Sequence, residues 1–333
     1  MSAADATPIL AHDRPLVHAT GVSKYFPVAS RGIGKPPRSL RAVESVDLTV
    51  ARGEVLGVVG ESGSGKSTVG RLLLRLVEPT AGRVVFDGQD VGALDADALR
   101  RFRRNMQMIF QDPFASLNAR MTVGDALKEP LVLHRRLNGR EAEEQGIALL
   151  EKVGLSADHM KRYPRAFSGG QRQRIAIARA LASEPSFIVA DEPVSALDVS
   201  IQAEVLNLMQ TLQQELSLAL LFISHDLSVV EVITDRVMVL YLGRVMELAP
   251  TEELYDHPEH PYTAALLQAA PGYAGARRHV LAGEIPSPLS PPSGCVFRTR
   301  CPFAIPDCAK IVPPVREVRP GHFKACIRDD LAL

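Results

Sequence analysis

The stretch GESGSGKS, Gly60 to Ser67, constrains the fold of this chain more than any other. It fits the pattern G-x-x-x-x-G-K-[ST], whose glycines let the backbone wrap around phosphate groups while the lysine supplies a positive charge. An apolar run at residues 54–59 (EVLGVV) precedes it, and residues 69–77 (VGRLLLRLV) follow with leucines at helical spacing. A phosphate loop between a strand and a helix predicts an α/β fold that binds a nucleoside triphosphate.

Residues 186–193 (SFIVADEP) provide the acidic half that such a site requires. The segment is apolar up to Asp191, which predicts a buried strand that ends in a Mg²⁺ ligand, acting directly or through water. Glu192 follows, where a carboxylate can orient an attacking water. A helical stripe over residues 201–216 and the apolar run at 218–223 complete a strand–helix–strand unit, typical of a parallel sheet.

The rest of the sequence predicts further strands and helices and the bounds of the domains. Strands are expected at residues 16–28 and 42–50, joined by a Gly- and Pro-rich loop, ASRGIGKPPRSL. Residues 121–163 read as a small helical subdomain, in which Gly154 ends one helix, and a helix after Gly170 is expected to run to Pro185. The expected domains are a disordered tail (1–15), a nucleotide-binding domain (16–250) that includes a helical part (about 113–175), and a C-terminal domain (251–333).

Composition and charge exclude some classes of protein. The 333 residues include 38 Lys and Arg and 38 Asp and Glu, so the formal net charge is zero, which does not favour a nucleic-acid partner. The longest apolar runs fall far short of the roughly 20 residues that span a bilayer. The first fifteen residues lack the pattern of a secretory signal. A cytoplasmic location, or attachment to a membrane through a partner, is therefore expected.

Six motifs in order resemble those of the ATP-binding subunits of ABC transporters. GESGSGKST resembles Walker A, IFQDP the Q-loop, FSGGQ the signature LSGGQ, IVADEP Walker B, SALD the D-loop and ISHD the switch histidine. Phe167 replaces the usual signature leucine, an apolar exchange at a packing position, and Tyr25 resembles the A-loop aromatic that stacks on adenine. The resemblance implies a RecA-like core with an antiparallel β subdomain, a helical signature subdomain and a small Cys- and Pro-rich C-terminal domain.

The resemblance also implies roles for individual residues. The catalytic set is Glu192, His225 and Gln111, and the Mg²⁺ ligands are Ser67, Gln111 and Asp191. The signature residues Ser168, Gly169, Gly170 and Gln171 face the ATP that another subunit binds, and the D-loop residue Asp198 is a further nucleotide-site residue. The implied ATP-binding residues of this chain are Tyr25, Gly60, Glu61, Ser62, Gly63, Ser64, Gly65, Lys66, Ser67, Thr68, Gln111 and Asp191.

The C-terminal part resembles the ATPases of oligopeptide and dipeptide importers, and within them the second of the two ATPase subunits. HPYTAALL, GEIPSPLSPPSGCVF and RCP carry this resemblance, together with QDPFASLNARMTVGDAL and DEPVSALDVSIQAEVLNLM. It implies a sister ATPase, two membrane permeases, an external peptide-binding protein and a place at the cytoplasmic face of a prokaryotic inner membrane. The cargo stays open, because nickel, glutathione, opine and murein-peptide importers share this tail.

The four cysteines, Cys295, Cys301, Cys308 and Cys326, have the spacing C-x5-C-x6-C-x17-C. Structural zinc sites usually show tight C-x2–4-C pairs, which this spacing lacks. Thiolate ligation with longer loops also suits an iron–sulfur cluster, and the resemblance implies a [4Fe–4S] cluster here. Zinc, reduced thiols and disulfides are the alternatives, and disulfides are the least expected in a cytosol.

Two other classes of protein remain as alternatives. Soluble ABC ATPases of DNA repair or translation usually carry a long coiled coil or two cassettes, whereas this chain has one Walker A motif and no long heptad run. A P-loop kinase or GTPase would not need FSGGQ, SALD and ISHD, and the guanine-reading N/T-K-x-D pattern is missing from the sequence.

Overall fold

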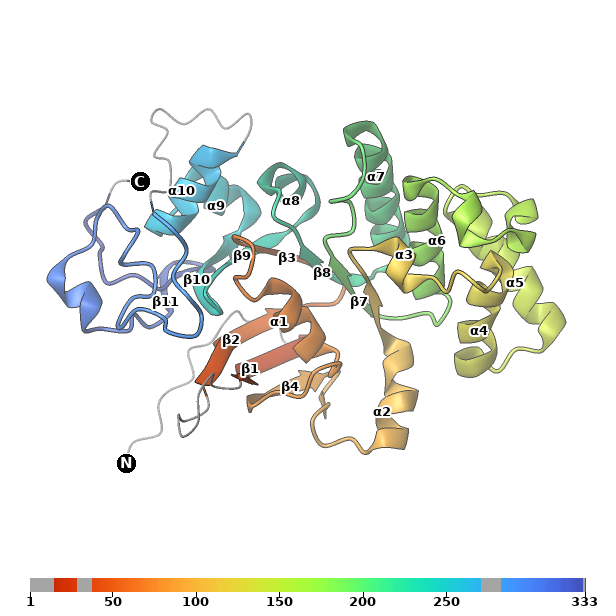
Figure 1. The fold of residues 1–333 in the computed structure, drawn as a ribbon, viewed down its shortest axis with the longest axis horizontal. Helices are drawn as coiled ribbons and strands as arrows, with labels where there is room; N and C mark the ends of the chain where they lie inside the picture. Colours follow the sequence, from red (N-terminus) through yellow and green to blue (C-terminus); the bar gives the residue numbers. More distant parts are fainter. Residues whose placement is uncertain (1–14, 29–37, 271–282, 332) are drawn as a thin grey trace. The chain divides into compact units, whose positions relative to one another are not determined.

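A computed structural model describes residues 15–28, 38–270, 283–331 and 333, and the chain divides into two compact units (Figure 1). The first unit comprises Met1–Ala51, Val55–Gly92 and Ser224–Leu333, and the second comprises Arg52–Glu54 and Ala93–Ile223. Residues 1–14, for which a disordered tail is predicted, lie outside the described residues.

An antiparallel sheet in the first unit has the strand order β2-β1-β4-β5. Strand β1 pairs with β2 along its whole length, from Val17 opposite Val50 to Val28 opposite Arg38. The prediction that the loop extends to residue 40 was wrong, because residues 38–40 pair with β1 and belong to β2. The strand bounds are β1 Val17–Val28, β2 Arg38–Val50, β4 Ala81–Phe86 and β5 Gln89–Asp90.

A second set of strands in this unit has the order β11-β12-β10-β9-β3. Strands β3 and β9 are parallel and buried throughout, as strands covered on both faces are, whereas β10, β12 and β11 follow in antiparallel pairing. The bounds are β3 Val55–Val59, β9 Arg236–Tyr241, β10 Arg244–Pro250, β11 Arg316–Arg319 and β12 His322–Lys324. The described residues that follow Pro250, called the C-terminal segment below, are joined to this sheet because β12 pairs with β10. The domain boundary near Thr251 stays a prediction.

Four α-helices of the described residues belong to the first unit. Helix α1 begins at Lys66, directly after the phosphate loop, and ends at Leu73, which is earlier than the leucine spacing predicts. It ends there because Arg75 adopts a left-handed backbone conformation (φ 48°) that a helix cannot contain. The bounds are α1 Lys66–Leu73, α8 Leu227–Ile233, α9 Thr251–Asp256 and α10 Pro261–Ala269.

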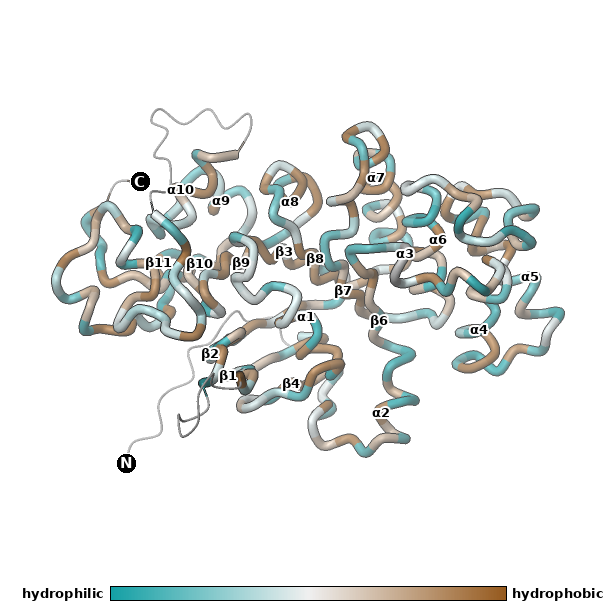
Figure 2. The backbone as a smooth tube through the Cα atoms, in the orientation of Figure 1, coloured by the Kyte–Doolittle hydropathy of each residue, from teal (hydrophilic) through white to brown (hydrophobic). Residues whose placement is uncertain are grey.

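The second unit contains three parallel strands in the order β6-β7-β8. Their apolar character is visible in Figure 2, where β7 and β8 are mostly brown. The predicted strand–helix–strand unit is confirmed, because α7 connects β7 to its parallel neighbour β8. The bounds are β6 Met106–Ile109, β7 Phe187–Asp191, β8 Ala219–Ile223, α2 Ala96–Phe102, α3 Pro113–Ser116, α4 Val123–Arg135, α5 Gly139–Lys152, α6 Gly169–Leu181 and α7 Val199–Leu216.

The predicted helices of residues 121–163 are confirmed as α4 and α5. A capping box at Thr122 starts α4, and its apolar face, Val123, Leu127 and Leu131, is fully buried. Gly154, with φ 75°, follows the end of α5 as a left-handed stop. Helix α6 ends at Leu181 and stops short of the expected end at Pro185.

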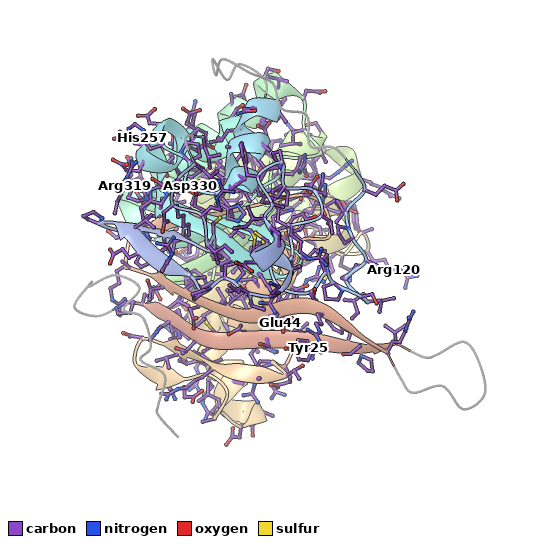
Figure 3. The ribbon with its side chains drawn as sticks, turned by 90° about the vertical axis from the view of Figure 1, so that its left-hand side faces the viewer. Tyr25, Glu44, Arg120, His257, Arg319 and Asp330 are labelled. Carbon is purple, nitrogen blue, oxygen red and sulfur yellow. The ribbon has the colours of Figure 1, made fainter. Side chains whose placement is uncertain are left out.

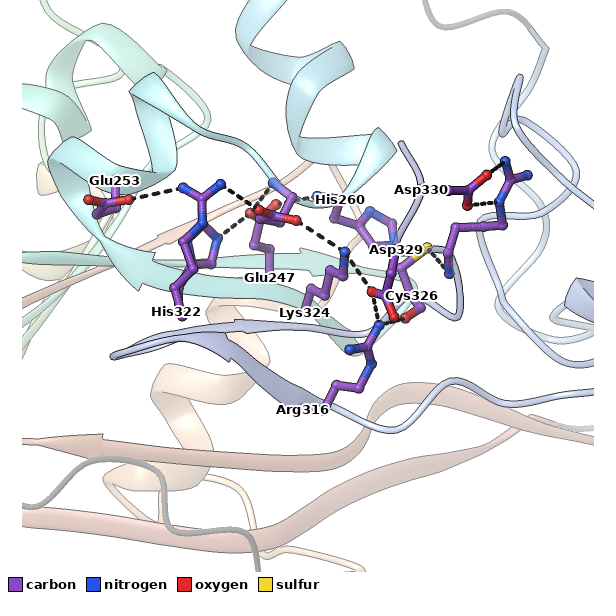
Figure 4. A network of polar contacts seen from close by, with 12 residues as sticks. Glu247, Glu253, His260, Arg316, His322, Lys324, Cys326, Asp329 and Asp330 are labelled. Atoms are coloured by element: carbon purple, nitrogen blue, oxygen red, sulfur yellow. Dashed lines mark hydrogen bonds and ion pairs between the residues drawn. The ribbon is translucent and has the colours of Figure 1, made fainter. Parts of the chain in front are cut away.

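A buried polar network fastens the C-terminal segment to β10 (Figure 4). The fully buried Glu247 accepts hydrogen bonds from the backbone N–H groups of Glu259 (2.7 Å) and His260 (3.1 Å). Its Oε1 also lies 2.7 Å from Nε2 of the fully buried His322 on β12. Lys324, on the same strand, forms an ion pair with Glu259 at 3.1 Å.

Candidate functional site

The phosphate loop of the first unit requires glycine at two positions. Gly60 (φ 145°) and Gly65 (φ 105°) have backbone conformations that residues with a side chain rarely adopt. A Cβ atom at Gly60 would lie 2.1 Å from the carbonyl oxygen of Leu240, and one at Gly65 would lie 2.4 Å from that of Ala42. The loop therefore packs tightly against Leu240 near the end of β9 and against Ala42 of β2, which fixes its path.

Lys66 lies folded into this loop, and its residue is only 6% exposed. Its Nζ donates hydrogen bonds to the carbonyl oxygens of Gly60 (2.6 Å) and Glu61 (3.1 Å). The buried Ser64 hydroxyl has no hydrogen-bond partner among the described residues. One short loop thus carries a lysine charge, a buried hydroxyl and the start of α1, which are the groups that a phosphate site uses.

Tyr25 and His225 belong to the same unit as the phosphate loop. Tyr25, labelled in Figure 3, is partly buried on β1 and pairs in register with Arg41. The neighbour of Arg41, Ala42, is the residue whose carbonyl oxygen abuts the loop. His225 is exposed and follows Ser224, whose N–H donates to the carbonyl oxygen of Val58 at the end of β3 (3.2 Å).

The second unit brings Gln111 and Glu192 together. Nε2 of Gln111, which follows β6, donates a 2.9 Å hydrogen bond to Oε2 of Glu192. Glu192 has a positive φ of 48°, rare for a residue with a side chain, and its N–H donates to the carbonyl oxygen of Ile223 at 2.9 Å. Asp191, at the end of β7, is 4% exposed. The end of β7 therefore places a buried carboxylate, Asp191, next to a partly exposed one, Glu192.

The signature FSGGQ forms the start of α6. Ser168 is the N-cap, and a reciprocal capping box with Gln171 engages both side chains with backbone N–H groups. A Cβ atom at Gly170 would lie 2.3 Å from Cγ2 of Ile201, so close packing of α6 against α7 requires glycine there. Phe167 is buried against His159, with ring centroids 5.1 Å apart, as its packing position predicts.

Asp198 is the exposed N-cap residue of α7. The predicted site residues thus fall into two groups. Tyr25, His225 and the phosphate loop with Ser67 and Thr68 belong to the first unit. The second unit holds the others: Gln111, Asp191, Glu192, Ser168, Gly169, Gly170, Gln171 and Asp198.

Two contacts of the phosphate loop are not predicted by the sequence. Tyr262 and Arg300 both contact Glu61, although 201 and 239 residues separate them from it in the chain. The motifs HPY and RCP contain these two residues, but their spacing carries no signal of a contact with the loop.

The four cysteines are free thiols in one neighbourhood of the first unit. The N–H of Cys295 donates to the carbonyl oxygen of Cys308 at 2.8 Å. Burial raises the pKa of the Cys301 thiol to about 11, and the charges of the other three thiols add to this rise. Burial also raises the pKa values of Cys295 and Cys326. Within the described ranges, no three Cys, His, Asp or Glu side chains are grouped as a metal would require.

Comparison with known proteins places this geometry in a family. The family model described as "ABC transporter" matches residues 43–195, and the one described as "Oligopeptide/dipeptide transporter, C-terminal region" matches residues 246–308. A Brucella ovis protein, provisionally named a peptide import ATP-binding protein, is 58% identical over 96% of this chain and 99% of its own length. The chain belongs to the ABC transporter family.

Further similarities agree with this ABC assignment. The oligopeptide transport ATP-binding protein AppF of Bacillus subtilis is 52% identical over 95% of this chain and 98% of its own length. The dimeric ATP-binding cassette MJ0796, solved with ADP and phosphate, has a TM-score of 0.63 and 30% identity, and covers 71% of this chain and 98% of its own. The predicted ABC ATPase fold is confirmed. Among the described residues, no helix is long and apolar enough to cross a bilayer.

Proposed function

We propose that this chain is the ATP-hydrolysing subunit of an ABC importer that takes up dipeptides or oligopeptides. The observation that carries the proposal is one chain that joins an ABC cassette to the oligopeptide/dipeptide C-terminal region. Relatives named for peptide import and oligopeptide transport align over nearly its whole length, which supports the peptide cargo.

The proposed chemistry is hydrolysis of the β–γ bond of ATP. Lys66 binds the β- and γ-phosphates, and Tyr25 stacks on adenine. Ser67, Gln111 and Asp191 hold Mg²⁺, which when bound neutralises charge on the phosphate oxygens. Glu192 orients the attacking water. The 2.9 Å hydrogen bond from Gln111 holds the Glu192 carboxylate in place, so a displacement of Gln111 changes the orientation of the base.

His225 is proposed to donate a hydrogen bond to the γ-phosphate. The residues Ser168 to Gln171 are assigned to the ATP site of an opposing ATPase subunit, and Asp198 is proposed as a further nucleotide-site residue. Support comes from α6, where the capping box occupies the Ser168 and Gln171 side chains while the free backbone N–H groups of the first turn favour an anion. The opposing subunit is proposed to be a sister ATPase.

The proposed assembly also contains two membrane permeases and an external peptide-binding protein. The chain would then lie at the cytoplasmic face of a prokaryotic inner membrane, attached through the permeases. A transport assay tests the assignment: the complex, purified with its permeases and reconstituted in proteoliposomes, should accelerate ATP hydrolysis when peptide-loaded binding protein is added. Acceleration by nickel or glutathione instead of peptide would assign a different cargo to the same ATPase.

We also propose that the four cysteines hold a [4Fe–4S] cluster. The chemistry of the donor set supports this, because four free thiols lie in one neighbourhood and interact electrostatically. The described side chains are not grouped as ligands, so no cluster geometry follows from them. Because burial raises the pKa values of Cys295, Cys301 and Cys326, binding would release protons from these thiols. Anaerobically purified protein should contain iron and acid-labile sulfide, whereas stoichiometric zinc without sulfide would contradict the cluster.

A further inference from the structure

The second residue of the phosphate loop, Glu61, is bound by an arginine of the C-terminal segment. The two nitrogens Nη1 and Nη2 of Arg300 lie 2.5 and 3.0 Å from the two carboxylate oxygens of Glu61, which is a bidentate ion pair. The Arg300 side chain is 4% exposed and that of Glu61 is 23% exposed. The pair is therefore shielded from solvent, unlike the ordinary surface pairs of this chain.

The backbone of Glu61 is bound from the same side. Its N–H donates a 2.9 Å hydrogen bond to Oη of Tyr262, a fully buried residue of α10. The ring of Tyr262 packs against those of Tyr241 (centroids 4.8 Å apart) and Phe297 (5.2 Å). The guanidinium carbon of Arg300 lies 5.8 Å from the Tyr241 ring centroid. One aromatic cluster, Tyr241, Tyr262 and Phe297, thus fixes both groups that hold Glu61.

The other side of Glu61 is part of the phosphate site. Its carbonyl oxygen accepts a hydrogen bond from Nζ of Lys66 (3.1 Å) and one from the N–H of Ser64 (3.1 Å). A movement of Glu61 therefore moves the acceptor that positions the lysine. The carboxylate also brings a negative charge into a loop that has to receive a triphosphate, and Arg300 neutralises that charge.

We propose that Arg300 and Tyr262 are positioning residues for ATP binding, so that the C-terminal segment completes the phosphate site. Tyr262 fixes the loop backbone at Glu61, and Arg300 neutralises and orients its carboxylate. The inference rests on the proposed function, because it concerns the ATP that the loop would bind. It adds that affinity for ATP depends on a segment outside the cassette motifs.

The charge of Glu61 distinguishes this role from a purely structural one. Arg300→Met leaves the Glu61 carboxylate unneutralised beside the phosphates, so the Kd for Mg-ATP should rise roughly tenfold, a usual size for coupling between contacting groups. Glu61→Gln removes the charge that repels the triphosphate. The double variant, Arg300→Met with Glu61→Gln, should therefore bind ATP more tightly than Arg300→Met alone. A role in stability alone predicts no such recovery.

The experiment measures Mg-ATP affinity of the full chain by calorimetry, at a temperature where thermal unfolding shows each variant to be folded. Tyr262→Phe, which loses only the hydroxyl that accepts from Glu61, should raise the Kd a few-fold. Arg319→Met is the matched control, because Arg319 pairs with Glu253 and Glu259 in the same C-terminal segment and should leave the Kd unchanged.

Wild-type affinity in a folded Arg300→Met variant, or equal loss in the single and double variants, would overturn the proposal. If Arg300→Met does not fold, Arg300→Lys is the variant to test. It keeps the positive charge but loses the bidentate pairing, so its affinity for Mg-ATP should be lower than that of the wild type. Unchanged affinity in both Arg300→Lys and Tyr262→Phe would also refute it. A wild-type chain that fails to bind ATP would instead refute the proposed function.

Discussion

The substitution Glu247→Gln tests how the C-terminal segment is held, because it changes one buried atom and keeps the side-chain shape. In the native chain, Oε1 accepts from the Glu259 N–H and lies beside His322, while Oε2 accepts from the His260 N–H (Figure 4). A glutamine amide has one oxygen and one NH2 group. Whichever way it turns, at least one backbone N–H faces a second donor.

The expected cost follows from that count. Leaving one buried donor unsatisfied costs about 1–3 kcal/mol, and the donor–donor contact adds to it, so Glu247→Gln should lower the free energy of unfolding by about 2–3 kcal/mol. Glu247→Ala removes all acceptors and leaves a cavity, so it should cost about 3–5 kcal/mol. The full burial of Glu247 and His322 is what makes these values large.

Urea unfolding followed by circular dichroism measures this, since the chain has no tryptophan to report by fluorescence. Glu253→Gln is the matched control: its side chain is 47% exposed and pairs with Arg319 at 3.5 Å, so a change below about 0.5 kcal/mol is expected. If Glu247→Gln also changed stability by less than about 0.5 kcal/mol, the network would not hold the segment as argued.

Two further variants test the packing and the electrostatics. Burial lowers the pKa of His260 from 6.5 to about 3, so its imidazole stays neutral in the fold while the unfolded chain takes up a proton. Stability should therefore fall by about 1.4 kcal/mol per pH unit below 6.5, and His260→Asn, which keeps the N-cap acceptor, should remove this part of the slope in urea titrations at several pH values. Gly170→Ala should cost about 1–3 kcal/mol because its Cβ meets Ile201, but clearly less in an Ile201→Ala background; an equal cost in both backgrounds would contradict the contact.

The phosphate loop and the local helices could be predicted because their signals are local. The glycines of residues 60–65 have conformations that few other residues adopt, so the pattern reports the backbone directly. The faces of α4 and α7 repeat within a few residues of sequence, and β7 ends where its apolar run meets Asp191.

Element ends were harder to predict where a distant partner decides them. Residues 38–40 of β2 resemble a loop by composition, but they pair with β1. The leucine pattern of α1 continues past Leu73, yet the left-handed conformation at Arg75 ends the helix. Neither outcome is visible in a window of local sequence.

The least predictable contacts join residues far apart in the chain. Arg300 and Tyr262 reach Glu61 over more than two hundred residues, and only the folded sheet brings them there. Likewise, the sequence of β12 alternates polar and apolar residues as an exposed edge strand would, yet His322 and Lys324 are buried by the tertiary structure. Their carboxylate partners lie elsewhere in the chain: Glu247 on β10, and Glu259 and Asp329 outside the helices and strands.

The most direct test of the central claim is the turnover of Glu192→Gln. If Glu192 orients the attacking water, this variant should bind Mg-ATP with nearly wild-type affinity while its rate of phosphate release falls by about 10²–10⁴-fold. Calorimetric binding and a phosphate-release assay on the same preparation give both values. Near-normal hydrolysis by Glu192→Gln would contradict the assignment of the base, and with it the proposed ATPase mechanism.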